Sequence, residues 1–171
     1  MKYLVGSTML GLSNNRDKDY LVITDEYGDY KSVRNGEEDI ICISYDTLVN
    51  RMEFKSDYKT NAYFLILNYQ FDKDIIGQDF PIEYHILDYK KELIQLLKTI
   101  VEYKLLNLNK RVSIKGGLCS KWLYHIAYNV FIIQNNSTVL TSEQKETIQK
   151  IHDKEMLISF RDELIKMISK L

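Results

Sequence analysis

The N-terminal part of the chain carries residue types that could bind a metal ion and a phosphate group. Gly6 and Ser7 end a short apolar run, Asp17 and Asp19 follow at alternate positions, and Asp39 comes later. When a glycine and a hydroxyl residue lie between a strand and a helix, the backbone N–H groups at the positive end of the helix dipole suit a phosphate. Aspartate oxygens are ligands that Mg²⁺ prefers. The combination predicts a site that binds magnesium and a phosphate group together.

The spacing of the aspartates indicates how they could share metal ions. Asp17 and Asp19 lie at i and i+2, so on a strand they project from one face, about 6.5–7 Å apart along the chain. Two metal ions about 3.5–4 Å apart could activate an attacking oxygen and stabilise a leaving pyrophosphate. Such a centre usually needs a third carboxylate from a neighbouring strand, ~4.8 Å away, and Asp39 is the strongest choice. The alternatives are Asp25, Glu37 and Glu38.

At these positions the chain resembles the nucleotidyltransferase superfamily of DNA polymerase β. The matching residues are the Gly6-Ser7 pair, Asp17 and Asp19, and the aspartate that opens a later strand, Asp39. The segment GSTMLGLSNNRDKDYLVI is similar to a bacterial and phage branch of predicted nucleotidyltransferases. The resemblance implies that the three aspartates are catalytic and bind Mg²⁺, with Mn²⁺ as the alternative ion. It also implies that Gly6 and Ser7 bind the triphosphate of a nucleotide.

The C-terminal part of the chain carries the rest of the resemblance. Members of this branch have a helical lobe with a lysine and a histidine on one helix, and Lys121 and His125 match that feature. Tyr128 lies on the same helix face, at a position where the branch commonly has an arginine. The resemblance implies that these three residues bind the nucleotide and close over it. Judged from the residues alone, a histidine in so apolar a helix is more often a core residue.

The hydrophobic pattern predicts an α/β (α+β) fold, in which a small mixed sheet precedes a set of helices. Strands are expected at residues 3–5, 17–24, 30–33 and 39–44. Helices are expected at residues 8–13, 47–54, 61–69, 88–106, 120–133, 143–152 and 156–171. The pattern changes near Lys110, which predicts an α/β lobe over residues 1–110 and a helical lobe over residues 111–171. The resemblance makes the first lobe nucleotidyltransferase-like and the second a cover for its site.

Short local signals indicate where these elements begin and end. The side chains expected to cap the helix that follows them are Ser7, Asp46 and Asp88. The other signals are a hairpin turn at Asn35-Gly36, a hinge at Gly116-Gly117 and a capping box formed by Thr141 with Gln144.

The composition limits the class of protein. With 171 residues, of which 45% are hydrophobic and 27% charged, the chain is expected to be globular rather than disordered. A formal net charge of -1 disfavours a sequence-independent nucleic-acid binder. The chain shows no signal segment and no apolar run of the ~20 residues that a membrane span requires, so we expect a cytoplasmic protein without a membrane partner. Cys42 and Cys119 are expected to be buried free thiols, and no partner is identified for His85 or His152.

Together these features predict a magnesium-dependent nucleotidyltransferase. It would move a nucleoside monophosphate from a nucleoside triphosphate (NTP) to a hydroxyl acceptor on an RNA end, a protein or a small molecule. The alternative is a non-catalytic module that keeps the fold and binds a nucleotide or a partner protein, as antitoxin-like and regulatory modules do. The direction of Asp39 separates the two hypotheses. Convergence with the paired aspartates favours catalysis, whereas an Asp39 that faces away favours the binding module.

Overall fold

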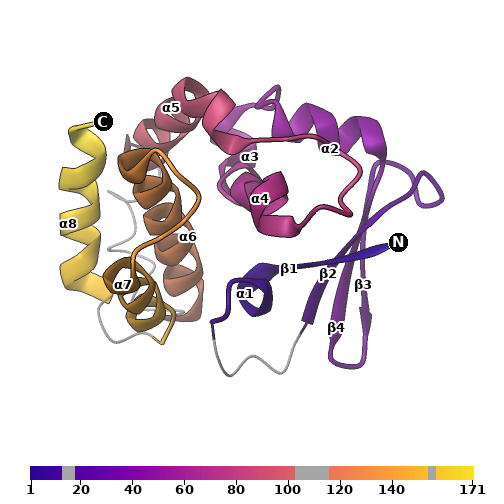
Figure 1. Cartoon of the computed structure of the whole chain (residues 1–171), viewed down its shortest axis with the longest axis horizontal. Helices are drawn as coiled ribbons and strands as arrows, with labels where there is room; N and C mark the ends of the chain where they lie inside the picture. Colours follow the sequence, from indigo (N-terminus) through magenta and orange to yellow (C-terminus); the bar gives the residue numbers. More distant parts are fainter. Residues whose placement is uncertain (13–17, 103–115, 154–156) are drawn as a thin grey trace. The chain divides into compact units, whose positions relative to one another are not determined.

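The computed structural model describes residues 1–12, 18–102, 116–153 and 157–171 (Figure 1). It confirms the predicted fold class, because a mixed four-stranded sheet is followed by helices. The strands are β1 (Lys2–Val5), β2 (Lys18–Ile23), β3 (Tyr30–Asn35) and β4 (Glu38–Ile43). The helices are α1 (Gly6–Met9), α2 (Tyr45–Met52), α3 (Tyr58–Leu65), α4 (Lys73–Ile76), α5 (Lys90–Ile100), α6 (Gly116–Asn135), α7 (Ser142–His152) and α8 (Leu157–Ser169), with 3₁₀ turns η1 (Asn68–Phe71) and η2 (Ile86–Tyr89).

The strand order of the sheet is β1-β2-β4-β3. β1 and β2 are antiparallel, β2 and β4 are parallel, and β3 and β4 are antiparallel. The predicted hairpin is confirmed, but its two-residue turn lies one position later than expected: Asn35 pairs with Glu38, and the turn residues are Gly36, with φ +64°, and Glu37. A positive φ is the conformation that this type of turn requires. The chain then returns along β4 to lie directly beside β2.

The two faces of the sheet differ in how many of their side chains are buried, because side chains alternate along each strand. Val5, Leu21 and Ile43 lie on one face and are all buried. The opposite face carries charged side chains at its surface, where the Nζ of Lys2 lies 2.7 Å from a carboxylate oxygen of Glu38. The face with the buried apolar residues therefore forms the core side of the sheet.

Contacts divide the chain into two compact units. The sheet unit comprises Met1–Ser56 and Asn68–His85, and the helical unit comprises Asp57–Leu67 and Ile86–Leu171. This division differs from the expected boundary at residue 110. The reason is tertiary: α5 packs against α3, α6 and α8, so it belongs with the later helices although it precedes the change in sequence pattern.

A buried polar pair holds α2 against η1 inside the sheet unit. The Nε of Arg51 donates to the side-chain oxygen of Asn68 at 3.2 Å, and the Asn68 amide donates to the Arg51 carbonyl at 2.8 Å. The guanidinium also lies over the ring of Phe71, 5.0 Å from its centroid. These reciprocal contacts compensate for the desolvation of Arg51, a residue that is only 9% exposed.

Helix α6 is the central element of the helical unit, and most of its described side chains are buried. The Asn129 amide donates to the carbonyls of Ile66 and His125, both at 2.8 Å, which joins α6 to the end of α3. The capping box of α7 is confirmed: the Thr141 hydroxyl accepts from the Gln144 N–H, and the Gln144 side chain accepts from the Thr141 N–H.

Two predicted helix caps and the predicted hinge are wrong. The cap of α2 is Ser44, which accepts from the Thr47 N–H, and Asp46 lies in the first turn instead. Asp88 lies within η2, and α5 begins after Tyr89 without a side-chain cap. The expected end of that helix near residue 106 lies outside the described residues. The glycines at 116 and 117 form no hinge, because their backbone already belongs to α6.

The region between α2 and α5 contains more short elements than the sequence indicated. α3 is capped by Asp57 and ends at Leu65, so the helix expected over residues 61–69 is displaced. α4 was not expected, although Asp72 caps its start and Gly77 lies at its end with φ +111°. An aspartate and a glycine that flank four residues are signals of a short helix. Cys42 is buried and free, as expected, and the Cys119 side chain lies outside the described set.

Candidate functional site

Gly6 and Asp19 approach each other very closely in the sheet unit. Val5, the last residue of β1, pairs with Asp19 on β2, so the residue that follows Val5 passes beside the aspartate side chain. Gly6 has φ +77°, and a Cβ added to it would lie 2.2 Å from Oδ2 of Asp19. Any larger residue at position 6 would therefore both strain the backbone and displace this carboxylate. The glycine is required by the position of the aspartate.

Asp39 is the direct neighbour of Asp19 across the parallel pair β2 and β4. Residues paired in this way project from the same face of a sheet, with their backbones ~4.8 Å apart. That face is the core side, and both aspartates lie near the start of their strands, where Asp39 keeps 35% of its side chain exposed. The sheet therefore brings the two carboxylates together at one end of its two central strands, where solvent can reach them.

A basic side chain continues this row across the sheet. Arg34 on β3 pairs with Asp39, and its Nε lies 3.8 Å from a carboxylate oxygen of that residue. Both side chains are substantially exposed, so the ion pair contributes little to stability. The ion pair matters for its position, because it places an exposed guanidinium next to the paired carboxylates.

Whether the paired carboxylates fit a magnesium ion can be judged from the ligand atoms that they supply. Asp19 and Asp39 supply hard oxygen ligands from neighbouring strands, which suits Mg²⁺ or Mn²⁺. Asp17, the expected partner two residues before Asp19, lies outside the described residues. The two described carboxylates fit such an ion, and the expected three-aspartate site stays a prediction.

The expected phosphate seat at Gly6 and Ser7 is built differently from the prediction. Ser7 does not cap a helix over residues 8–13: α1 begins at Gly6, ends at Met9 and has Val5 as its N-cap residue. The Ser7 side chain is buried, with the residue 3% exposed. The Gly6 N–H donates to the side-chain oxygen of Gln70 at 3.2 Å. The positive φ of Gly6 turns the chain one residue earlier than expected, so this N–H contacts protein instead of facing solvent.

The second group of expected site residues belongs to the helical unit. His125 is 3% exposed, and its ring lies against those of Tyr124 and Tyr63, with centroids 4.1 Å and 6.5 Å away. Burial lowers the pKa of the imidazole to about 3, and the charges of Lys121 and His152 act in the same direction. His125 is thus a neutral core residue, and the expectation that it faces a nucleotide is not supported. Lys121 is exposed and Tyr128 is partly buried.

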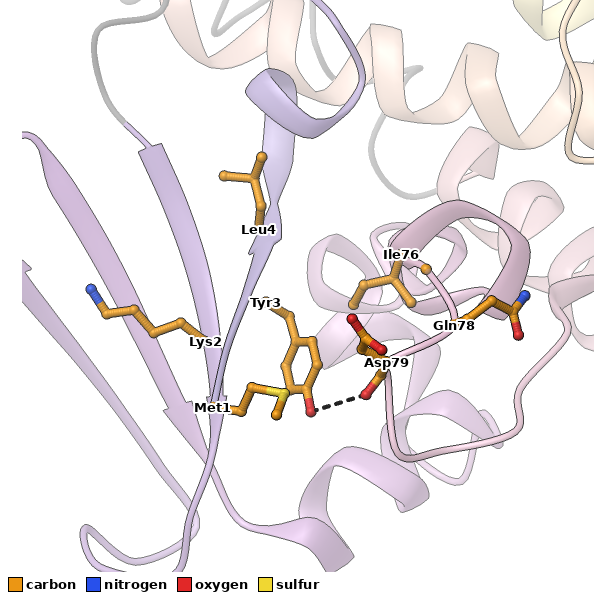
Figure 2. Close-up of a pocket in the computed structure, with 8 residues that line it drawn as sticks. Met1, Lys2, Tyr3, Leu4, Ile76, Gln78 and Asp79 are labelled. Atoms are coloured by element: carbon orange, nitrogen blue, oxygen red, sulfur yellow. Dashed lines mark hydrogen bonds between the residues drawn. The ribbon is translucent and has the colours of Figure 1, made fainter.

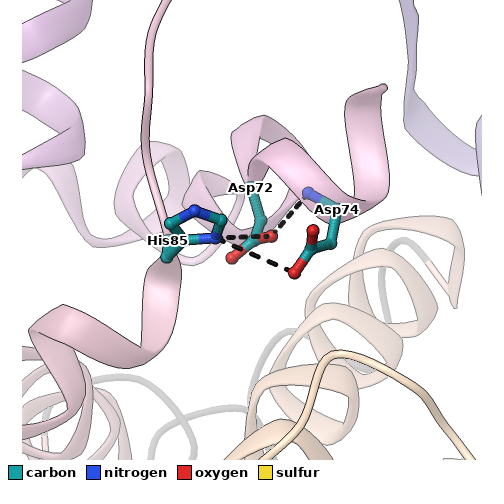
Figure 3. A group of neighbouring side chains, drawn as sticks. All are labelled: Asp72, Asp74 and His85. Carbon is teal, nitrogen blue, oxygen red and sulfur yellow. Dashed lines mark hydrogen bonds and ion pairs between the residues drawn. The ribbon is translucent and has the colours of Figure 1, made fainter. Parts of the chain in front are cut away.

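Sequence reasoning missed a cluster of Asp72, Asp74 and His85 in the sheet unit, shown in Figure 3. Oxygen and nitrogen atoms of these side chains lie within 4.8 Å of one another. The Nε2 of His85 is 3.1 Å from a carboxylate oxygen of Glu83. This hydrogen bond raises the pKa of His85; desolvation opposes the rise, and the charges of Asp72 and Asp74 add to it. The available signal was the pair of short patterns D-x-D at 72–74 and E-x-H at 83–85.

An open pocket of about 350 Å³ lies elsewhere in the sheet unit, between β1 and the segment after α4 (Figure 2). The Tyr3 hydroxyl donates to the Asp79 carbonyl at 3.4 Å, and the Tyr3 ring meets Phe80 edge-on at 5.1 Å. The residues that line the pocket are Met1, Lys2, Tyr3, Leu4, Ile76, Gly77, Gln78 and Asp79. Asp19 and Asp39 are not part of this lining, so the pocket is separate from the paired carboxylates.

Comparisons of the chain with models of protein families, with curated proteins and with solved structures give no match. Among the helices that the structure describes, none combines the length and the apolar character that crossing a bilayer requires.

Proposed function

We propose that the chain is a magnesium-dependent nucleotidyltransferase. The observation that carries the proposal is the register of Asp19 and Asp39 on neighbouring parallel strands, beside a glycine that leaves space for the first of them. The side-chain direction of Asp39 was the feature that separated catalysis from a non-catalytic module, and its pairing with Asp19 supports catalysis. The resemblance to the superfamily of DNA polymerase β supports the same activity.

In the proposed reaction, a hydroxyl oxygen of the acceptor attacks the α-phosphorus of an NTP. The bond between the α-phosphorus and the bridging oxygen breaks, and pyrophosphate leaves with that oxygen and its electron pair. Mg²⁺, or Mn²⁺ in its place, would supply Lewis-acid stabilisation of the phosphate charges when bound. Asp19, Asp39 and the expected Asp17 would hold the ion. Asp39 would also take the proton of the acceptor hydroxyl.

Two residues are assigned roles in substrate binding. Gly6 would keep the wall beside Asp19 free of a side chain, so that a triphosphate can approach the backbone. Arg34, which lies next to Asp39 and is largely exposed, could exchange its ion pair for a phosphate oxygen. Ser7 is a weaker candidate than the sequence indicated, because it is buried. The proposed acceptor is a hydroxyl group on an RNA end, a protein or a small molecule.

A non-catalytic nucleotide- or partner-binding module is the second candidate function. The observation in its favour is the hydrogen bond from the Gly6 N–H to Gln70, which removes a donor that the phosphate seat was expected to provide. Such a module would bind an NTP, or a partner protein, without releasing pyrophosphate.

The test uses NTPs labelled on either the α- or the γ-phosphate, with Mg²⁺ or Mn²⁺ and total RNA, protein or a hydroxyl compound as acceptor. Transfer of the α-label with loss of the γ-label is expected. Asp19→Asn and Asp39→Asn should each reduce transfer at least about 100-fold, since each removes a charged ligand from the ion. Glu38→Gln is the matched control, because Glu38 precedes Asp39 on the same strand and projects from the opposite face.

Calorimetry with each NTP adds a measurement that does not depend on the acceptor. Binding that requires Mg²⁺ and is lost in Asp19→Asn, without transfer to any acceptor class, would favour the binding module. NTP binding that is absent from the wild type, or unchanged in both asparagine variants, would refute the proposed site.

A further inference from the structure

We propose that Asp72, Asp74 and His85 form a binding site for a divalent transition-metal ion, with Zn²⁺ as the best match. The site lies on elements other than β2 and β4 and does not rest on the proposed transferase activity. Asp72 and Asp74 flank the first residue of α4, and His85 precedes η2 (Figure 3).

The backbone holds these segments together without help from an ion. The Lys73 N–H donates to the Tyr84 carbonyl at 2.8 Å, which fixes the segment that carries His85 beside the start of α4. Asp72 caps α4 through a bond from the Asp74 N–H to its Oδ1 at 3.0 Å. The backbone positions of all three residues are therefore determined by the fold of the sheet unit.

The distances leave room between the side chains. The Nδ1 of His85 lies 3.8 Å from Oδ1 of Asp72 and 3.8 Å from Oδ2 of Asp74. Hydrogen bonds are shorter, at about 2.7–3.2 Å, so Nδ1 donates to neither carboxylate. Ligand atoms around a tetrahedral zinc ion, with bonds of about 2.0–2.2 Å, lie about 3.4 Å apart. Shifts of a few tenths of an ångström in the partly exposed His85 and the exposed Asp74 would shorten both 3.8 Å distances to that spacing.

A second observation points independently to a metal ligand. The Nε2 of His85 lies 3.1 Å from Oε1 of Glu83, and an ionised carboxylate can only accept, so Nε2 carries the hydrogen. In the neutral ring this tautomer leaves the lone pair of Nδ1 directed at Asp72 and Asp74. Histidines that bind metals commonly donate their other N–H to a carboxylate, which orients the ring and raises its basicity. Glu83 has that position here.

The burial and charge of these side chains determine which ion the site would bind. Asp72 has a side chain only 1% exposed, whereas those of Asp74 and His85 are 62% and 38% exposed. A buried carboxylate beside a second one is stabilised by a nearby cation, and the exposed ligands leave a route for it to enter. An imidazole with two carboxylates suits zinc and related ions better than Mg²⁺ or Ca²⁺, which prefer oxygen ligands alone. Three protein ligands would leave a coordination position for water.

The experiment titrates chelator-treated protein with Zn²⁺ in a calorimeter, in the wild type and in the Asp19→Asn, Asp39→Asn background. One saturable site is expected in both, which separates it from the proposed transferase site. His85→Ala and Asp74→Asn should each weaken binding at least about tenfold, and Glu83→Gln about 10- to 100-fold. The matched control is His152→Gln, because His152 also lies beside a carboxylate, that of Asp153, but belongs to no such cluster among the residues that the structure describes.

A spectroscopic readout identifies the ligand atom. The chain has three histidines, so ¹⁵N NMR of the labelled imidazoles can be assigned with the His85 variant. Zinc should shift the Nδ1 resonance of His85 and leave its Nε2 protonated. Absence of saturable Zn²⁺ binding in the wild type, or equal affinity in the His85→Ala and Asp74→Asn variants, overturns the proposal.

Discussion

Lowering the pH from about 7.5 to about 5 should destabilise the helical unit through one buried imidazole, that of His125. In the unfolded chain this group takes up a proton as the pH falls below about 6.5. In the folded chain it stays neutral, because burial lowers its pKa to about 3. The unfolded state therefore binds more protons over this range, and the free energy of unfolding must fall as the pH falls.

The size of the effect follows from the two pKa values. Between about pH 7.5 and pH 5, linkage gives a loss of about 2 kcal/mol in the free energy of unfolding. The result hardly depends on the folded value, since any pKa below about 4 leaves the native imidazole neutral at pH 5. Because the side chain is almost fully buried, little of this penalty is relieved by solvent.

Urea unfolding followed by tryptophan fluorescence would measure this loss. Trp122 is the only tryptophan, lies on α6 with His125 and contacts the ring of Tyr63, with centroids 5.2 Å apart. In His125→Gln the loss between the two pH values should be smaller than in the wild type by about 2 kcal/mol. Any change that is equal at both pH values cancels from this comparison.

His85→Gln is the control of opposite sign. The pKa of His85 is raised in the folded chain, so its contribution to stability is present at low pH and is lost as the pH rises. Its removal should make the acid-induced loss larger, as followed by circular dichroism. Equal losses in the wild type and in His125→Gln would mean that protons reach the native imidazole, which would refute its assignment to the core.

Two further predictions test the packing of the sheet unit. Gly6→Ala should destabilise the protein by about 1–3 kcal/mol more than Gly28→Ala in denaturant melts, because the added Cβ meets Asp19 at position 6 but open space at position 28. Both glycines have φ +77°, so each alanine would adopt a left-handed φ, and equal losses would contradict the close approach. Asn68→Ala should cost about 2–4 kcal/mol in the same assay, since it removes both hydrogen bonds to the buried Arg51. A loss below about 1 kcal/mol would mean that water or another group replaces the amide.

Local signals in the sequence determined the elements whose ends depend on nearby residues. The Thr141–Gln144 capping box was predicted and is observed, and the hairpin predicted from Asn35-Gly36 is observed with its turn one residue later. Each is stabilised by contacts within a few positions, so the sequence contains all the interacting groups. For the same reason Ser44 and Asp46 could be confused, because both are good caps near the start of one helix.

The sequence predicted only part of the pairing between Asp19 and Asp39. A hydrophobic strand that opens with Asp39 was predicted to lie near the Asp19 strand. Its parallel alignment with β2, which makes the two aspartates direct neighbours, depends on the return of the chain through β3. Register between strands is determined by which faces are buried, and that is a property of the assembled sheet.

Contacts between residues far apart in the chain were decided by the tertiary structure alone. Gln70 accepts the Gly6 N–H, and His85 meets Asp72 and Asp74, through folding of the segment between α2 and α5. Likewise, His125 is buried against Tyr63 of α3, a neighbour that no pattern on α6 could specify. Residue types and spacing determine which groups are able to do chemistry. Which of them are exposed, buried or already bonded depends on the segments that pack around them, because burial and hydrogen bonding are properties of the assembled structure.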